Sequence, residues 1–224
     1  MGKKYLRRGF IGQLALLAFG SVMLGACSKR KPVENSGLAE DAVGSEGQNK
    51  IAENHKMPRD LVMKLLDQKV DHYMQISNNC AQSSFMALTE QFGIKADAVL
   101  KALTPLPGIA ERGETCGAVT GPLMVFGLIY GRGKNKLHDW DVYRASLIPS
   151  GRFCKQFEAT FGSAMCSDIQ KAKFGRSFQL TDPEDLRAFQ ETDATLQCSA
   201  VVRKAVRMAA EIMLNDQNTV DESL

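Results

Sequence analysis

Cysteine is the residue type that could do most chemistry in this sequence, and five of its six cysteines lie beyond residue 79. These five are Cys80, Cys116, Cys154, Cys166 and Cys198. All except Cys154 are expected in the first turn of a helix, because each follows a residue able to cap one. A helix start favours the thiolate, and activated thiols have pKa values of roughly 3.5–7.5 instead of about 8.5. The expected capping residues are Asn79, Thr115, Ser163 and Thr195.

These four cysteines are separated by 36, 50 and 32 residues, so no two form a C-x-x-C pair. The sequence therefore contains neither a thioredoxin-like motif nor a zinc-ribbon motif. Spacing alone leaves three uses open: reactive thiols, metal ligands, or plain disulfides that staple an exported protein.

The stretch Gly113–Gly131 is the centre of this pattern. Thr115 is expected to cap a helix whose first turn holds Cys116. Pro122 is expected to bend this helix or to delay its regular start to about Thr120. One face of the first turns is nearly bare, so that another backbone, another thiol or a cofactor can approach it. The residues that leave it bare are Gly117, Ala118 and Gly121.

The surrounding elements are predicted to be helices. Apolar residues recur at helical spacing from about Pro58, and no run alternates convincingly like a strand. Pro149 is expected to divide the helical stretch between residues 138 and 161. We therefore predict an all-α fold, a compact bundle of about six to eight helices behind a disordered N-terminal tether.

The amino terminus is predicted to be an address and not part of the fold. Residues 1–26 carry a basic start followed by a short apolar stretch, which is the pattern of a signal peptide. Arg7-Arg8 resembles a twin-arginine export signal, and Leu24-Gly25-Ala26-Cys27 resembles the bacterial lipobox. A lipidated Cys27 would hold the protein at a membrane. We expect an exported, membrane-anchored lipoprotein on the extracytoplasmic side of the cell envelope.

The predicted organisation after the signal peptide is a flexible polar linker over 27–56, a helical domain over 57–216 and a tail over 217–224. The signal peptide also accounts for the formal charge of +3. Without its four basic residues, 24 basic residues remain against 25 acidic ones. A nearly neutral mature chain without a basic stripe argues against a nucleic-acid partner.

The sequence resembles the C_GCAxxG_C_C family, which is described as redox-active on the strength of its cysteines. The matching residues are Asn79-Cys80-Ala81-Gln82, the segment Arg112–Gly121 with its Cys-Gly-Ala-x-x-Gly core, Phe161-Gly162 before Cys166, and Cys198. The resemblance covers about residues 60–214. It implies that the family's four-cysteine pattern falls on Cys80, Cys116, Cys166 and Cys198.

Two departures from the family pattern stand out. Leu106-Pro107 and Ile109-Ala110 occupy a stretch that tends to be glycine-rich in relatives, so the flexibility of this loop is expected to differ. Cys154 lies outside the pattern. It is expected to be a buried apolar residue, with a resolving thiol or a spare ligand as the alternatives.

The preferred hypothesis is a membrane-anchored redox protein that works through its cysteine thiols. Cys116 is the expected nucleophilic or electron-exchanging thiol. Cys80 is its expected partner, because the helix and loop between them can fold back as a helical hairpin. Cys166 and Cys198 would form a second pair or a relay.

Two alternatives stay open. The first is an electron-transfer protein with an iron–sulfur cluster or another metal on Cys80, Cys116, Cys166 and Cys198, which a twin-arginine signal favours. The second is a non-catalytic lipoprotein stapled by inert disulfides. The expected partners are a membrane, reached through Cys27, and a redox partner protein.

Overall fold

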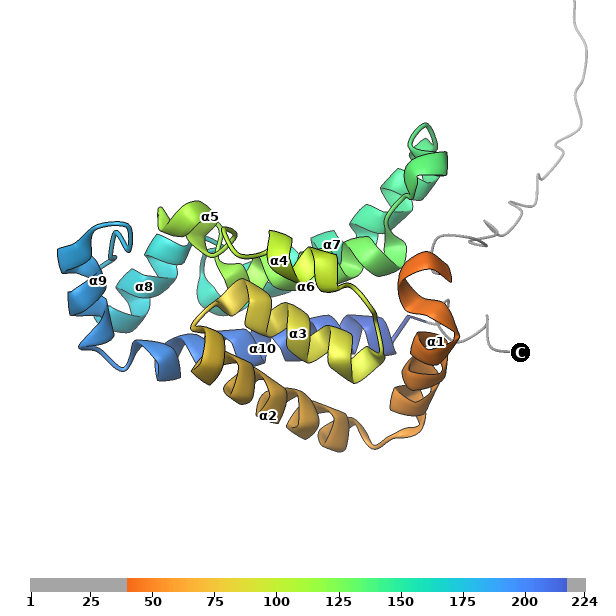
Figure 1. Cartoon of the computed structure of the whole chain (residues 1–224), viewed down its shortest axis with the longest axis horizontal. Helices are drawn as coiled ribbons and strands as arrows, with labels where there is room; N and C mark the ends of the chain where they lie inside the picture. The colour runs from red at the N-terminus through yellow and green to blue at the C-terminus, as the bar shows by residue number, and fades with distance from the viewer. Residues whose placement is uncertain (1–39, 217–224) are drawn as a thin grey trace, which may run out of the picture. The chain divides into compact units, whose positions relative to one another are not determined.

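The computed structural model describes residues 40–216, and these residues fold into helices without any strand (Figure 1). The prediction of an all-α fold is confirmed. Ten α-helices stand where six to eight were predicted, partly because the described part begins with a helix in the predicted linker and includes a four-residue turn. The elements are α1 (Glu40–Lys56), α2 (Arg59–Ser77), α3 (Cys80–Phe92), α4 (Asp97–Ala102), α5 (Gly108–Glu111), α6 (Gly117–Tyr130), the 3-10 helix η1 (Lys134–Lys136), α7 (Trp140–Phe161), α8 (Cys166–Phe174), α9 (Pro183–Gln190) and α10 (Ala194–Leu214).

Helix α3 is the centre of the core, where it packs against α6, α2 and α10 (Figure 1). Its inward face carries Phe85, Leu88 and Phe92, all of them essentially inaccessible to solvent. Helix α7 packs on α6, and the ring of Phe153 meets that of Phe126 edge to face at a centroid distance of 5.8 Å. Helix α10 completes the core with a stripe of small and branched side chains at helical spacing. This stripe includes Val202, Ala205, Val206 and Ala209.

Two glycines allow α6 to approach α3 closely. A Cβ atom at Gly117 would lie 2.6 Å from the backbone nitrogen of Ala81 and would also collide with the sulfur of Cys80. A Cβ atom at Gly121 would collide with the hydroxyl of Ser84 and the carbonyl oxygen of Ala81. Since the two glycines are one helical turn apart, they form one bare face of α6. The predicted close approach of another backbone and another thiol is that of α3 and Cys80.

Helix α1 differs from the prediction of a flexible linker over residues 27–56. Residues Glu40–Lys56 are helical, with a kink at Gly44. Ile51 is buried in the core, and Asn54 exchanges two hydrogen bonds with Gln91, one of them through the Gln91 carbonyl oxygen at 2.9 Å. These tertiary contacts compensate for a composition that has little intrinsic tendency to fold. The rest of the predicted linker, the predicted signal peptide and the predicted tail lie outside the described residues.

The helix starts agree only partly with the prediction. Asn79 caps α3 as expected, because its side-chain oxygen accepts the N–H of Gln82 at 2.9 Å and leaves Cys80 as the first helical residue. Helix α6, however, begins at Gly117 with Cys116 itself in the capping position. Helix α10 begins at Ala194, so Cys198 lies in its second turn and not in its first.

The other predicted caps are also different in the structure. Thr115 pairs with Met165 in an isolated antiparallel bridge, and the residue before α8 is Met165. Ser163 accepts the N–H of Met165 at 3.0 Å, which supports the approach to α8 without capping it. Thr195 lies inside α10, where its hydroxyl donates to the side-chain oxygen of Asn78 at 3.0 Å.

The prolines interrupt less than predicted. Helix α6 is regular from Gly117 although Pro122 lies within it, and α7 runs unbroken from Trp140 to Phe161 across Pro149. The start of α7 is held by Asp139, whose carboxylate accepts two backbone N–H groups. No helix in the 40–216 range combines the length and the apolar character needed to cross a membrane.

Candidate functional site

The fold brings four distant cysteines to one place. A small cavity of about 30 Å³ is lined by Cys80, Cys116, Cys166 and Cys198 together. Cys80 and Cys166 are the first residues of α3 and α8, Cys116 immediately precedes α6, and Cys198 lies on α10. All four are free thiols in this structure. The sequence prediction singled out these four residues, and the fold gathers them.

Cys116 and Cys166 are held side by side by their own backbones. The segment 113–116 runs antiparallel to the segment 164–167, with Thr115 and Met165 as the bridge pair. The N–H of Cys116 donates to the carbonyl of Ala164 at 2.9 Å, and the N–H of Cys166 donates to the carbonyl of Glu114 at 2.6 Å. This non-local pairing fixes the two thiols independently of the helices that follow them.

The thiol of Cys116 is the most enclosed of the four. Cys116 is 6% exposed, and it forms hydrogen bonds with the thiols of Cys166 and Cys80. The bond with Cys166, then the bond with Cys80, and then burial raise the pKa of Cys116 well above its ordinary value. Its side chain accepts no backbone N–H at the start of α6. The prediction of an activated thiolate at Cys116 is therefore wrong, because the thiol lies among other thiols and not over the free amides of a helix.

Cys166 has the opposite electrostatics. The hydrogen bond from Cys116 lowers the pKa of Cys166, against burial and the charge of Glu111, which both raise it. Cys166 also receives a hydrogen bond at 3.6 Å from the side-chain amide of Gln170, one turn further along α8. Gln170 is buried, and its carbonyl oxygen accepts the N–H of Phe178 at 2.8 Å, which fixes the orientation of the amide. Within the cluster, these contacts favour Cys166 as the thiolate.

Cys198 is a second weakly acidic thiol of the cluster. Burial, followed by the charges of Cys80 and Cys166, raises the pKa of Cys198 to about 12. Cys198 therefore stays protonated at neutral pH. A thiol of this kind can donate a hydrogen bond to a neighbouring thiolate but is a poor nucleophile itself.

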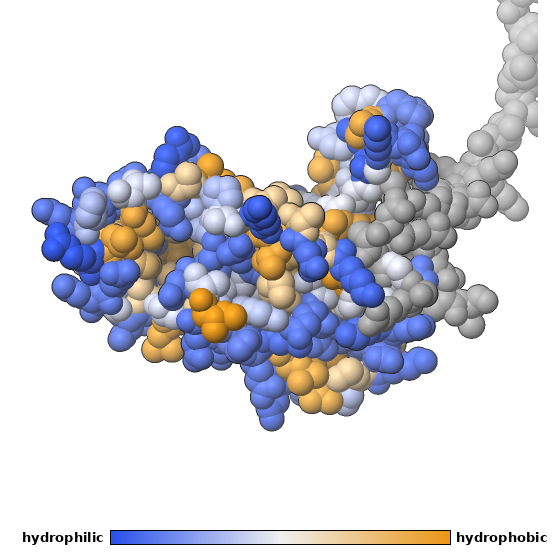
Figure 2. Space-filling model, viewed as in Figure 1, coloured by the Kyte–Doolittle hydropathy of each residue, from blue (hydrophilic) through white to orange (hydrophobic). Residues whose placement is uncertain are grey.

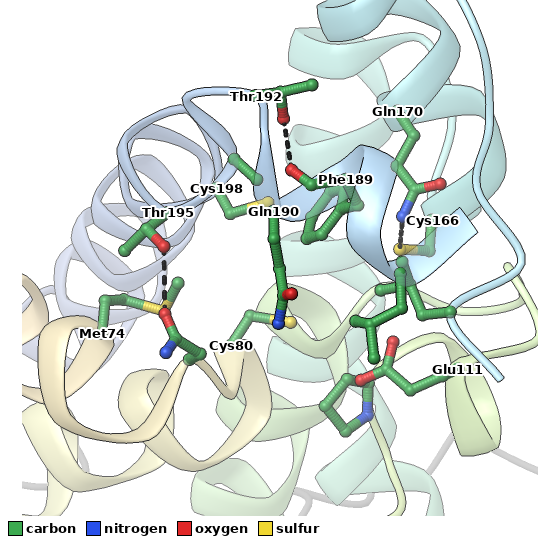
Figure 3. A pocket seen from close by; sticks show the side chains of 15 residues that line it. Met74, Cys80, Glu111, Cys166, Gln170, Phe189, Gln190, Thr192, Thr195 and Cys198 are labelled. Carbon is green, nitrogen blue, oxygen red and sulfur yellow. Dashed lines mark hydrogen bonds between the residues drawn. The ribbon is translucent and has the colours of Figure 1, made fainter. Parts of the chain in front are cut away.

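A larger pocket of about 300 Å³ leads to the cluster from outside (Figure 3). Three of the four cysteines line it, Cys80, Cys166 and Cys198, whereas Cys116 does not. The remaining wall is built from the end of α2, the turn at α5, α8, the segment that includes α9, and the start of α10. A molecule in this pocket would meet Cys166 before it could meet Cys116.

Cys154 does not line either cavity. It is half-buried on α7 and packs against the core, and burial, followed by the charge of Glu158, raises its pKa. Cys154, expected to be a buried apolar residue, is thus only partly buried and lies outside both cavities.

A structural metal site needs several ligating side chains within reach of one ion. Between residues 40 and 216 no group of three or more His, Cys, Asp or Glu side chains is arranged to hold a metal ion. As placed, the four thiols do not form a ligand set for the iron–sulfur alternative.

Two residues of the site were missed in the sequence. Gln170 lies four residues after Cys166, and helical spacing from that cysteine was the signal that could have found it. Glu111 lines the larger pocket from α5, where three consecutive non-glycine residues have positive φ angles, at 47°, 59° and 59° for Ile109, Ala110 and Glu111. No sequence signal indicates such a left-handed turn, since none of the three is glycine or asparagine.

Comparison with known proteins places the motif in its family. The model of the family described as "Putative redox-active protein (C_GCAxxG_C_C)" matches residues 78–212. This range includes all four cysteines of the cluster and the segments that pair beside Cys116 and Cys166. No curated protein and no solved structure matches the chain.

Proposed function

Because the chain belongs to the C_GCAxxG_C_C family of redox-active proteins, we propose that it exchanges electrons through thiol–disulfide chemistry, with Cys166 as the attacking thiolate and Cys116 as the resolving thiol. The observation that carries the proposal is the position of the two thiols: Cys166 lines the larger pocket, whereas its neighbour Cys116 is 6% exposed and lines only the smaller cavity. The contact between them also lowers the pKa of Cys166 and raises that of Cys116. Such an asymmetric pair is what stepwise disulfide exchange requires, because only the first thiol has to be ionised at the outset.

The proposed reaction has two steps. The Cys166 thiolate attacks one sulfur of a substrate disulfide, the substrate S–S bond breaks, and the departing thiolate takes up a proton. Cys116 then loses its proton and attacks the sulfur of Cys166. This second attack releases the other half of the substrate as a thiol and leaves a disulfide between Cys116 and Cys166, so two protein thiols are oxidised and one substrate disulfide is reduced.

Cys80 is a second possible disulfide partner of Cys116. Cys116 contacts both Cys166 and Cys80, so it is the common member of two possible disulfides. A Cys80 thiolate that attacks the Cys116 sulfur of this disulfide would move the bond to the Cys80–Cys116 pair and release Cys166 as a thiolate for another substrate. Cys198, whose pKa is raised to about 12, would act as a proton donor to its neighbours and not as the entry point.

This assignment differs from the sequence hypothesis, in which Cys116 is the nucleophile and Cys80 its partner. The reason is exposure: Cys166 lines the larger pocket, and Cys116 lies behind it. The contact between Cys116 and Cys80 keeps the predicted pair as the second of the two disulfides.

The test is a controlled oxidation of full-length protein purified without oxygen. Metal content and free thiols are measured first, then a limiting amount of a disulfide oxidant is added and the cross-linked peptides are identified by mass spectrometry. We expect the first disulfide to join Cys116 and Cys166. Cys154→Ala is the matched control, because Cys154 lines neither cavity.

Three outcomes would contradict the proposal. Stoichiometric bound iron would favour the electron-transfer alternative. Thiols that resist both oxidation and alkylation in the native protein would favour the inert scaffold. A first disulfide that excludes Cys116 would overturn the assignment of the resolving thiol.

We propose in addition that the protein is exported and anchored to a membrane through a lipid on Cys27. The support is the sequence alone: Arg7-Arg8 and the Leu24-Gly25-Ala26-Cys27 lipobox stand at the spacing of a lipoprotein signal. Metabolic labelling with a radioactive fatty acid should mark the wild-type protein and leave Cys27→Ala unlabelled. Equal labelling of the two proteins would exclude this anchor.

A further inference from the structure

The larger pocket beside the cysteines has a distinctive charge. Among the described residues that line it, Glu111 is the only one with a charged side chain. Lys173, a cation that lowers the pKa of Cys198, lines the smaller cavity and not this pocket. A ligand in the pocket therefore meets one carboxylate and no compensating positive group.

Glu111 is held at the pocket wall by its backbone. Gly108, Ile109, Ala110 and Glu111 all have positive φ angles between 47° and 59°, which makes α5 a left-handed turn. The turn is closed by the N–H of Glu111 donating to the carbonyl of Pro107 at 2.9 Å, and by the N–H of Arg112 donating to the carbonyl of Gly108 at 3.0 Å. A non-glycine residue in this conformation costs about 1–2 kcal/mol, and such strain is concentrated at functional sites.

The carboxylate of Glu111 acts on the sulfurs that line the pocket. Figure 3 shows its side chain on the same wall as Cys166. Its charge raises the pKa values of both Cys166 and Cys198, so it lies within electrostatic reach of both thiols. A cationic group bound beside Glu111 would neutralise this effect at the point where Cys166 attacks.

Part of the pocket lining is apolar. Phe189 on α9 lies in a cluster with Phe174 and Phe178, with ring centroids 5.7 and 5.3 Å from its own. Leu186 and Leu180 also line the pocket. Figure 2 shows hydrophobic surface gathered at the end of the molecule that carries α8 and α9. A pocket of about 300 Å³ lies at the lower limit of the usual small-ligand range.

We propose that this pocket binds small disulfides that carry no anionic group, and that Glu111 gives preference to those with an amine beside the disulfide. The inference rests on the proposed thiol–disulfide function. The bound disulfide lies with its sulfur at Cys166 and its aliphatic part on the wall formed by Phe189 and Leu186. The exchange then follows the two steps above: the substrate S–S bond breaks, two substrate thiols leave, and the disulfide of Cys116 and Cys166 forms.

The experiment compares three disulfides that are similar in size and differ in charge. These are cystamine, bis(2-hydroxyethyl) disulfide and 3,3′-dithiodipropionate, with a cationic, a neutral and an anionic group on each half. The single-turnover rate with pre-reduced full-length protein is measured by acid quenching and mass spectrometry. Each rate is divided by that of 1-thioglycerol, a neutral thiol that differs from the halves of all three probes, with the same disulfide, which removes intrinsic differences in reactivity.

We expect normalised rates in the order cation, neutral, anion, with about a tenfold ratio between the first and the last at low salt. Added salt should reduce this ratio. Glu111→Gln should bring this ratio near one, because its effect on the pKa of Cys166 is common to the three probes. Glu111→Asn is the second variant, because asparagine tolerates the left-handed conformation and also removes the charge. Glu184→Gln is the control, because Glu184 is an exposed residue of α9 that does not line the pocket. This variant should keep the wild-type ratio.

The contrary results distinguish failure of this inference from failure of the proposed function. Equal normalised rates for the three disulfides, or the fastest rate with the anion, would overturn the inference while the proposed function survives. Reaction with a disulfide-bonded polypeptide but with none of the three probes would do the same. No reaction with any disulfide would overturn the proposed function itself.

Discussion

At the scale of single residues, the site depends on the different acidities of two neighbouring thiols, Cys166 and Cys116. Cys116 donates the hydrogen bond that it forms with Cys166, so ionisation of Cys166 is stabilised and that of Cys116 is opposed. The amide of Gln170 adds a second donor to the sulfur of Cys166. Helix position alone, which the sequence analysis used, gives all four cysteines the same tendency. The difference between them comes from the donors and acceptors that each sulfur meets in the fold.

The first prediction concerns the nucleophile. In the reduced protein, Cys166 should be alkylated by iodoacetamide with a pH midpoint below the ordinary thiol pKa of about 8.5. Cys116→Ala removes the donated hydrogen bond and should move this midpoint upward. The measurement is the alkylation rate of each cysteine against pH, followed by peptide mass spectrometry. Cys154→Ala should leave the Cys166 profile in place, and an unmoved midpoint in Cys116→Ala would contradict the assignment.

At the scale of elements, the Cys-Gly-Ala-x-x-Gly core allows two helices to pack closely against each other. Its glycines place the start of α6 directly against α3, where Cys80 lies. This contact was predictable, because glycines one turn apart leave a bare helical face. The pairing of segments 113–116 and 164–167 was not predictable, because it depends on a non-local backbone approach that Thr115 and Met165 do not signal. Helix α1 was missed because Ile51 is almost alone as a large apolar residue in its sequence.

The second prediction separates two glycines of the same helix. Gly121→Ala should destabilise the protein by about 1–3 kcal/mol, because the new methyl group would collide with Ser84 and the backbone of Ala81. Gly127→Ala is the matched control, since a Cβ atom there meets nothing within 4 Å. It should be neutral or stabilise by about 0.5–1 kcal/mol. Urea unfolding of the two reduced variants checks both values, and equal effects would show that the α3–α6 contact is looser than described.

The third prediction concerns the left-handed turn at α5. Ala110 is exposed and has a φ angle of 59°, so Ala110→Gly loses no packing and relieves backbone strain. A stabilisation of about 1 kcal/mol is expected. Ala98→Gly, at an exposed position of the right-handed helix α4, should instead destabilise by about 0.5–1 kcal/mol. If Ala110→Gly is as destabilising as Ala98→Gly, the turn is not left-handed in solution.

At the scale of the whole molecule, the buried thiols couple stability to pH. Cys198 has a pKa of about 12 in the folded protein, whereas an unfolded thiol ionises near 8.5. A pKa that is raised on folding gives a contribution that is complete below the unfolded value and is lost as pH rises towards the folded value. Between these pH values the unfolded chain binds fewer protons than the folded protein, so the free energy of unfolding must fall.

The fourth prediction follows from this linkage. Above about pH 8.5, Cys198 should contribute a loss of about 1.4 kcal/mol per pH unit to the free energy of unfolding of the reduced protein. Cys198→Ala should show a shallower decline by that amount, whatever its stability at pH 7. Urea unfolding at pH 7, 8, 9 and 10 under reductant provides the comparison. Parallel pH profiles for the two proteins would mean that Cys198 is accessible to water in the folded state.

The antiparallel segments that hold Cys116 beside Cys166 have a thermodynamic consequence. A bond between these sulfurs closes a loop of 50 residues of sequence, and closing a loop of that length removes about 4 kcal/mol of chain entropy from the unfolded ensemble. Two-electron oxidation or reduction of this pair therefore changes the free energy of unfolding of the whole helical domain. By the same cycle, the folded scaffold makes its oxidised form harder to reduce than the corresponding unfolded chain.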